Sequence, residues 1–206
     1  MERKYYAIKL SIAMIFVYLL QFLLPSLTQH LAFQASSFLT RPWTFVSSIF
    51  AHSQTDLMHL LNNLFFLALF GSILEGEVGS RRFLGAFLLT GLFANLSAFF
   101  FYPESLVLGA SGAISGIVAA LAIYKPRQIG LFWGVPVPMW VAFLGWIVTN
   151  LVGFGAESSI AFEAHLFGLF AGSIYGAYLR NKRERKKKSK ESVDEEEIEK
   201  WEERFM

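Results

Sequence analysis

Two side chains that could act together in hydrolysis lie in segments that are otherwise apolar. Ser111 lies in the run Gly109 to Gly112, which opens an apolar segment rich in small residues, and His165 lies in the run Ala164 to Gly168 of another. Hydrocarbon tolerates polar groups poorly, so nucleophilic and ionisable side chains inside a span are functional candidates. A serine hydroxyl becomes a nucleophile when a neutral histidine takes its proton. The pair therefore indicates acyl-transfer chemistry.

The composition places this chain in a membrane. Its 206 residues are 54% hydrophobic and 17% aromatic, which is too apolar for a soluble domain of this size. We expect an all-α, polytopic membrane protein with six transmembrane helices in residues 1–180, followed by a charged tail, 181–206. The apolar stretches are Tyr5 to Leu24, Leu57 to Leu74, Phe83 to Tyr102, Ser111 to Tyr124, Ile129 to Phe154 and Ile160 to Leu179.

The basic residues predict the orientation of these spans. Of 18 Lys and Arg residues, all but Arg41 fall in segments that six spans place on one side. Basic residues resist translocation, so both termini are expected in the cytoplasm, with the protein in the cell membrane. The basic run Lys182 to Lys190 is best explained as a topogenic stop, with contact to anionic lipid as a second interpretation. The acidic segment Asp194 to Met206 does not resemble a nucleic-acid site.

One long connection, Pro25 to Asp56, is expected on the external side. It contains an apolar stretch, Trp43 to Ala51, that is too short to span a membrane. We expect this loop to be partly embedded in the membrane and packed on the helical bundle. His52, near its end, is interpreted as an interfacial residue.

The depths of Ser111 and His165 follow from counting along each helix. Ser111 is 14 residues from Lys125, and His165 is 15 residues from Arg180. At about 1.5 Å per residue, the two lie roughly 21 and 22 Å from the cytoplasmic ends of their spans. In a hydrocarbon core about 30 Å thick, both belong in the outer half. The predicted site therefore opens to the external side.

Two more polar residues belong to the same level. Counted from Glu75, Asn63 lies roughly 18 Å and His59 roughly 24 Å along the second span. They are at positions i and i+4, hence on one helical face. His59, Asn63 and the backbone N–H of Ser111 are candidate donors to an oxyanion. No acid is well placed for a triad, because Glu163 would point to a different face of its span and Asp56 lies a turn above His59, so a Ser-His dyad is predicted.

Small residues give a reason for lateral contact. Gly112 and Gly116 share a face of the fourth apolar stretch, and Gly168, Gly172 and Gly176 form a stripe on the sixth. Membrane helices approach closely along small faces. Because His165 lies on the same face as the stripe, contact between the two faces would bring it to Ser111.

These motifs resemble those of the rhomboid intramembrane serine proteases, in the minimal six-span form. The matching patterns are GxSG at Gly109 to Gly112, AHxxGxxxG at Ala164 to Gly172, HxxxN at His59 to Asn63, and GxxxExxxG at Gly71 to Gly79. The resemblance implies that Ser111 is the nucleophile, His165 the general base, and His59 and Asn63 oxyanion stabilisers.

The resemblance also implies supporting roles and reveals two departures. Glu75 and Arg41 resemble a structural glutamate and the arginine of the first loop, and Gly109, Gly112, Gly168 and Gly172 belong to the supporting motifs. Ser115 stands where the family usually has an aromatic residue beside the histidine, and Thr40 stands where a tryptophan usually precedes the arginine. Neither change removes a group that the reaction requires.

Three function classes fit the pattern to different degrees. The resemblance implies a serine endopeptidase that cleaves single-span membrane proteins in or near their transmembrane segments, without a cofactor or metal. A metal hydrolase built on His52, Asp56, His59 and His165 is disfavoured, because no HExxH pattern is present and His59 with Asn63 is a poor metal pair. The third class, an inactive rhomboid-like binding or chaperone protein, is disfavoured because Ser111 and His165 are both present.

Overall fold

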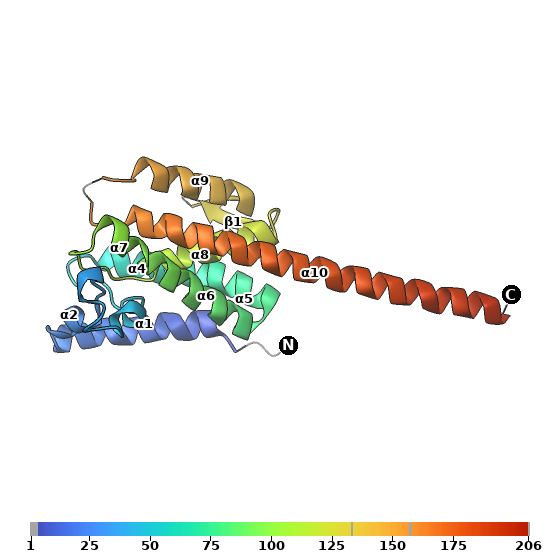
Figure 1. Ribbon diagram of the computed structural model, residues 1–206, viewed down its shortest axis with the longest axis horizontal. Coiled ribbons are helices and arrows are strands. Elements are labelled where there is room, and N and C mark those ends of the chain that lie inside the picture. The colour runs from blue at the N-terminus through green and yellow to red at the C-terminus, as the bar shows by residue number, and fades with distance from the viewer. Residues whose placement is uncertain (1–3, 133, 157, 206) are drawn as a thin grey trace.

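The computed structural model describes residues 4–132, 134–156 and 158–205, and its architecture is mostly helical (Figure 1). A two-stranded hairpin interrupts the helical order before α9. In chain order, the elements are α1 (Tyr6–Leu23), α2 (Leu27–Leu31), η1 (Ala35–Ser37), α3 (Thr44–Ser47), α4 (Leu57–Phe66), η2 (Leu67–Gly71), α5 (Ser72–Val78), α6 (Ser80–Asn95), α7 (Ser97–Phe101), α8 (Ser111–Tyr124), β1 (Ile129–Phe132), β2 (Val135–Pro138), α9 (Met139–Val152) and α10 (Phe162–Phe205).

Three helical rods are long and apolar enough to cross a membrane. They are α1, the continuous rod Leu57–Val78 and the rod Ser80–Phe101, while α8 and α9 are shorter apolar helices. The middle rod passes through a π-helical turn, η2, between α4 and α5. These helices confirm a helical membrane protein; the number of spans stays a prediction.

The predicted fifth span is wrong in its first ten residues. Residues 129–132 and 135–138 form the antiparallel hairpin β1–β2, in which Ile129 pairs with Pro138 and Phe132 with Val135. Pro136 lies in β2, an edge strand of this two-stranded sheet, where its missing N–H is tolerated. The hairpin brings the chain back beside the residue that precedes β1: the Met139 N–H donates to the Gln128 carbonyl at 2.8 Å. The helix α9 therefore begins at Met139.

The centre of the bundle is a seam between α8 and α10 in which backbones touch through glycines. A Cβ on Gly168 would lie 2.0 Å from the Gly112 carbonyl oxygen, and one on Gly172 would lie 2.0 Å from that of Gly116. No side chain fits at such distances. The predicted contact of the two small faces is confirmed, and we call it the glycine seam (Gly112, Gly116, Gly168, Gly172 and Gly176).

The helix α6 covers the other side of α8. A Cβ on Gly112 would meet the Ala94 side chain, and the Thr90 hydroxyl of α6 donates to the Ala113 carbonyl of α8 at 3.1 Å. As a result, every residue from Gly112 to Ala122 is buried. The helix that begins at Ser111 is therefore held on several sides.

The long connection between α1 and α4 is a folded element. Its Phe33, Phe38 and Phe45 form a cluster of edge-to-face rings with Phe99 of α7. Asn95 of α6 donates to the Phe45 carbonyl and to the Ser48 hydroxyl. The expectation that this loop packs on the bundle is confirmed, and its depth in the membrane stays a prediction.

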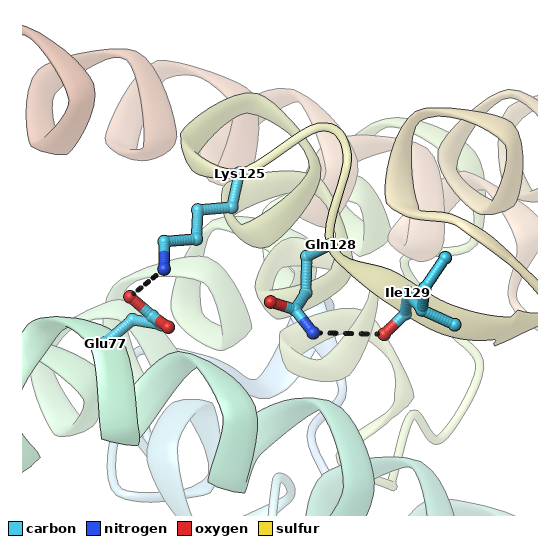
Figure 2. Close-up of polar contacts among 4 residues, drawn as sticks. All are labelled: Glu77, Lys125, Gln128 and Ile129. Carbon is cyan, nitrogen blue, oxygen red and sulfur yellow. Dashed lines mark hydrogen bonds and ion pairs between the residues drawn. The ribbon is translucent and has the colours of Figure 1, made fainter.

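The end of the bundle opposite the long connection, which we call the tail end, carries a cluster of charged groups. There Lys125 forms an ion pair with Glu77, with 2.6 Å between Nζ and Oε2 (Figure 2). The helix α10 continues without a break from Phe162 to Phe205, and its second half projects beyond the other helices (Figure 1). The boundary expected at residue 180 is thus not a break in secondary structure.

Candidate functional site

Ser111 is positioned by a turn that only glycine can make. Gly109 has a φ of +112°, a backbone conformation unfavourable for other residues. A Cβ at this position would also lie 2.6 Å from Nε2 of His59. The Gly109 N–H donates to the Ser48 carbonyl, which ties the turn to the loop before α4. Ser111 is consequently the first residue of α8, where backbone N–H groups have no partner within the helix.

Ser111 and His165 are in direct contact. The distance between Ser111 Oγ and His165 Nε2 is 2.8 Å, and both residues are half-buried. Ser111 comes from α8 and His165 from α10, and the adjacent glycine seam holds the backbones of these two helices together. The predicted meeting of these two side chains is confirmed. A hydroxyl at this distance from an imidazole nitrogen has the geometry for proton transfer.

The other ring nitrogen of His165 has a partner that the sequence did not suggest. Its Nδ1 lies 2.8 Å from Oδ1 of Asn150, which comes from α9 and is only 2% exposed. The Asn150 Nδ2 donates to the Trp146 carbonyl one turn earlier, at 2.7 Å. The Glu163 carboxylate instead accepts from the Gly155 N–H, so the expectation that it points away from His165 is confirmed.

Ser115 contacts the same peripheral helix. The Trp146 indole N–H donates to Ser115 Oγ at 3.1 Å, and Ser115 is fully buried. The Trp146 ring also packs edge-to-face on Phe66, with ring centroids 5.1 Å apart. The side chain that stands in the usual place of an aromatic residue therefore accepts a hydrogen bond from α9.

His59 and Asn63 lie one turn apart on α4, as predicted. The His59 ring covers Gly109, two residues before Ser111. Asn63 is 3% exposed, and its Nδ2 donates to the His59 carbonyl at 2.6 Å. Its Oδ1 is buried and has no hydrogen-bond partner among the described residues. A side-chain amide has two N–H groups, so the bond to His59 leaves a second one as a donor.

His52 is buried inside the protein, and its expected place at the membrane interface stays a prediction. It is fully shielded, and its ring lies 5.3 Å from that of His59, centroid to centroid. Gln21 of α1 clamps its backbone, with Oε1 accepting the His52 N–H and Nε2 donating to its carbonyl. Burial, with a smaller effect of the His59 ring, lowers the pKa of His52 to about 4. His52 therefore supports His59 as a neutral side chain.

The two predicted supporting residues lie away from Ser111. Glu75 accepts hydrogen bonds from the N–H groups of Tyr6 and Ala7 and from the Ser80 hydroxyl. It thereby caps the N-terminus of α1 at the tail end. Arg41 donates to the Gln29 carbonyl and to Oε1 of Gln34, which ties the first loop together.

The metal-hydrolase alternative gains no support from this arrangement. Within the part of the chain that the structure describes, no group of three or more His, Cys, Asp or Glu side chains is placed to hold a metal ion. Asp56 accepts the His59 N–H and caps α4, at 3.1 Å, so its carboxylate serves that helix.

Fold and site together define the class: an integral membrane protein whose helices bring a serine and a histidine into hydrogen-bond contact. The family model of the Rhomboid domain matches residues 39–182, which include Ser111, His165 and most of the described helices. The chain belongs to the rhomboid family.

Individual relatives carry rhomboid names in several organisms. The chain is 33% identical over 137 residues to the Rhomboid-like protein 11, chloroplastic, of Arabidopsis thaliana, covering 66% of this chain and 44% of the relative. It is 30% identical over 152 residues to the Rhomboid protein 1, mitochondrial, of Saccharomyces cerevisiae, covering 69% and 43%. It is 30% identical over 148 residues to the Putative rhomboid protease YdcA of Bacillus subtilis, covering 70% of each chain. The match thus spans less than half of the first two relatives.

Proposed function

We propose that this protein is an intramembrane serine endopeptidase. The observation that carries the proposal is the 2.8 Å contact between Ser111 Oγ and His165 Nε2, formed inside a bundle of apolar helices. Membership of the rhomboid family and similarity to a relative named as a putative protease support it. The substrates are single-span membrane proteins, cleaved in or near their transmembrane segments.

The reaction follows from the two side chains. The Ser111 oxygen attacks the carbonyl carbon of the scissile peptide bond while its proton passes to His165 Nε2. The tetrahedral intermediate collapses, the C–N bond breaks, and His165 returns the proton to the leaving amine. A water molecule, deprotonated by His165, then attacks the acyl-enzyme and releases Ser111. No cofactor is needed for these steps.

Three groups at or near the start of α8 and on α4 are the proposed donors to the developing oxyanion. The backbone N–H of Ser111 lies at a helix N-terminus, where the helix dipole also favours negative charge. His59 covers the turn before Ser111, and Asn63 retains one N–H beyond its bond to the His59 carbonyl. Each such donor is commonly worth about 3 to 4 kcal/mol of transition-state stabilisation. We assign oxyanion stabilisation to these three groups.

The proposed topology has six spans, with both termini in the cytoplasm and the site opening to the external side of the cell membrane. Three membrane-length rods, the shorter apolar helices α8 and α9, and the apolar first part of α10 support the six spans. The tail end contains Lys125, Arg127 and the basic part of α10. Residues 1–180 form the protease domain, and 181–206 form a cytoplasmic tail.

Labelling of the active serine tests the proposal. A fluorophosphonate probe should label the wild-type protein in proteoliposomes and leave Ser111→Ala unlabelled. Ser173→Ala, which removes a half-buried hydroxyl of α10 that bonds the Leu169 carbonyl of its own helix, is the matched control and should still be labelled. Single-span substrates should be cut only by the labelled proteins, with products mapped by mass spectrometry. Equal cleavage by Ser111→Ala would refute the proposal, and folded wild type without labelling or cleavage would favour the inactive rhomboid-like alternative.

A further inference from the structure

We infer that Asn150 is a positioning residue that fixes the tautomer and the orientation of His165. This inference rests on the proposed function, in which His165 is the base. It arises from a buried amide on a peripheral helix: Asn150 is 2% exposed, and its Oδ1 lies 2.8 Å from His165 Nδ1. Apart from Asn150, only Met139 and Ala142 are buried on α9.

The orientation of the Asn150 amide is determined by its second contact. Its Nδ2 lies 2.7 Å from the Trp146 carbonyl oxygen, which can only accept. The nitrogen of the amide therefore faces the helix, and the oxygen faces His165. An amide oxygen can only accept as well, so His165 Nδ1 must carry a proton.

The tautomer of His165 follows from that proton. A neutral imidazole with a proton on Nδ1 has a lone pair on Nε2, and Nε2 is the atom that lies 2.8 Å from Ser111 Oγ. The ring is thus poised to take the proton of Ser111. In Ser-His-Asp and Cys-His-Asn proteases the third residue has this role on Nδ1. Asn150 supplies it here from α9.

The contact between Asn150 and His165 also explains how His165 is held although Ser115 stands where the family usually has an aromatic residue. With Ser115 in that place, no ring from α8 holds His165. The Trp146 N–H donates to Ser115 Oγ, and Asn150, one turn further along α9, reaches His165. Two hydrogen bonds from one helix replace a packing contact. A membrane interior, poor in competing water, favours such bonds.

Kinetics of Asn150 variants form the first arm of the test. Asn150→Leu keeps the side-chain size and removes the acceptor, and it should lower kcat by about 10-fold to 10²-fold with KM within about twofold. Asn150→Asp, which keeps an acceptor oxygen, should recover most of that loss. Thr149→Val is the matched control, because the Thr149 hydroxyl bonds only the Gly145 carbonyl of its own helix on the exposed side of α9. It should keep the wild-type kcat.

The second arm measures the tautomer without turnover. Nδ1 of His30 and of His52 also faces a backbone carbonyl, so in protein labelled with ¹⁵N-histidine the His165 signals are assigned by their loss in His165→Ala. The His165 ring should show the Nδ1-protonated pattern in wild type and in Thr149→Val, and lose it in Asn150→Leu. Wild-type activity from Asn150→Leu, or an unchanged tautomer in that variant, would overturn the inference. If Asn150→Leu fails to fold, Asn150→Ala takes its place in both arms. A tautomer that depends on Asn150 in a wild-type protein unable to cleave would instead refute only the proposed function.

A second observation, at the tail end, carries a separate proposal: we propose a binding site for the phosphate of an anionic lipid headgroup. A hollow of about 430 Å³ lies between the end of α8 and the basic part of α10. Five of its lining residues are cationic, namely Lys125, Arg127, Arg180, Arg183 and Lys187. Glu184 is the acidic residue of the lining, and it is paired with Arg180.

The lining of this hollow combines charge with fixed geometry. Lys125 is held by Glu77 on α5 (Figure 2), and the Arg183 guanidinium lies 5.5 Å from the centre of the Tyr124 ring. Both contacts hold basic side chains at the rim of the bundle, directly beyond the apolar helices. Basic hollows between helices at a membrane surface suit the phosphates of anionic lipids. This proposal assigns the second interpretation of the basic run, contact with anionic lipid, to particular residues.

Native mass spectrometry and vesicle titration can test this site. The double variant Arg127→Gln/Arg183→Gln should bind phosphatidylglycerol at least about tenfold more weakly than wild type. The matched control Arg185→Gln/Lys188→Gln removes the same charge from residues of α10 that do not line the hollow, and it should bind like wild type. Phosphatidylcholine and inorganic phosphate are the comparison ligands. Equal losses in the two double variants, or equal binding of the neutral lipid, would refute a lipid phosphate site; saturation by inorganic phosphate alone would identify a free-anion site instead.

Discussion

The helices α8 and α9 are both apolar and both 14 residues long, yet they hold opposite positions in the molecule. On α8, every residue from Gly112 to Ala122 is buried against α6 and α10. On α9, large apolar side chains such as Trp140, Leu144, Val148 and Leu151 are about half exposed. The central helix, α8, is therefore held by backbone contacts, whereas the peripheral helix, α9, is held by a few side chains.

This difference separates two kinds of attachment. At the glycine seam, α8 and α10 approach so closely that no side chain fits between them, and the contact has no freedom to slide. At the periphery, α9 is attached by side chains: Trp146 bonds Ser115 of α8, and Asn150 bonds His165 of α10. The helix α1 is attached to α5 through Glu75. The seam positions the reacting atoms, α9 orients His165 through side chains, and α1 supports the fold away from the site. Each prediction below tests one side of this distinction.

The largest effect is expected at the pair of side chains that the seam positions, Ser111 and His165. His165→Ala removes the proposed base and should lower kcat for a single-span substrate at least about 10³-fold, with loss of fluorophosphonate labelling. Because His165 is half-buried and contributes no backbone contact to the seam, the melting temperature should change little. Cleavage assays in proteoliposomes and thermal unfolding measure the two quantities. Retained labelling in a folded His165→Ala protein would contradict the role of base.

The next largest effect concerns the oxyanion. Asn63→Ala should lower kcat about 10²-fold, because a developing negative charge loses a donor. Asn62→Ala is the matched control: Asn62 is the exposed neighbour on the same helix, and its loss should leave kcat unchanged. Steady-state kinetics on one substrate give both values. A change of less than threefold for Asn63→Ala would exclude Asn63 from the oxyanion site.

The seam and its two side chains could be predicted from the sequence for physical reasons. A membrane helix has a fixed rise, so distances counted from Lys125 and Arg180 place Ser111 and His165 at one level. Small residues indicate which faces meet. Both rules apply to regular helices with clear charged ends, and α8 and α10 fit that description. The contact at 2.8 Å between these side chains confirmed the expectation.

Asn150 could not be found in the same way, because the fifth span was given the wrong start. Counted from Arg127 along a helix, Asn150 would lie roughly 34 Å away, at the far surface of the membrane. The hairpin β1–β2 brings the chain back, and α9 begins at Met139. Counted from there, Asn150 lies roughly 17 Å up, near the level of Ser111. An apolar hairpin of valine, isoleucine and proline looks like the beginning of a membrane span.

The burial of His52 inside the protein could not be predicted for a related reason. It lies in a segment without regular structure between α3 and α4, so no helical count applies to it. Its burial depends on Gln21, 31 residues earlier in the chain, which bonds both backbone groups of His52. The resemblance to a family indicated the chemical groups of the site. Long-range contacts of irregular segments required the structure.

A smaller effect, on stability, tests how tightly the seam is packed. Gly172→Ala places a methyl group 2.0 Å from the Gly116 carbonyl oxygen, so the backbones must separate. Overpacking of this kind costs about 1 to 3 kcal/mol. The matched control is Gly85→Ala on α6, where the nearest atom to the new methyl group is the Tyr175 hydroxyl at 4.0 Å. Reversible unfolding in detergent should show a loss for Gly172→Ala alone, and equal stability of the two variants would disprove a rigid seam.

The smallest effect is expected where a peripheral helix is held far from the site. Glu75→Ala removes the acceptor for the N–H groups of Tyr6 and Ala7, and loss of such a cap costs about 1 to 2 kcal/mol of stability. The nearby Glu77→Ala is the matched control, since its pair with Lys125 is partly exposed and should contribute less than about 1 kcal/mol. Because α1 does not carry a reacting group, kcat should stay within about twofold of wild type in both variants, whereas Asn150→Leu should lower kcat with little change in stability. A large fall in kcat for Glu75→Ala at a temperature where the protein remains folded would mean that α1 also positions the reacting atoms, and the distinction between seam and periphery would then fail at α1.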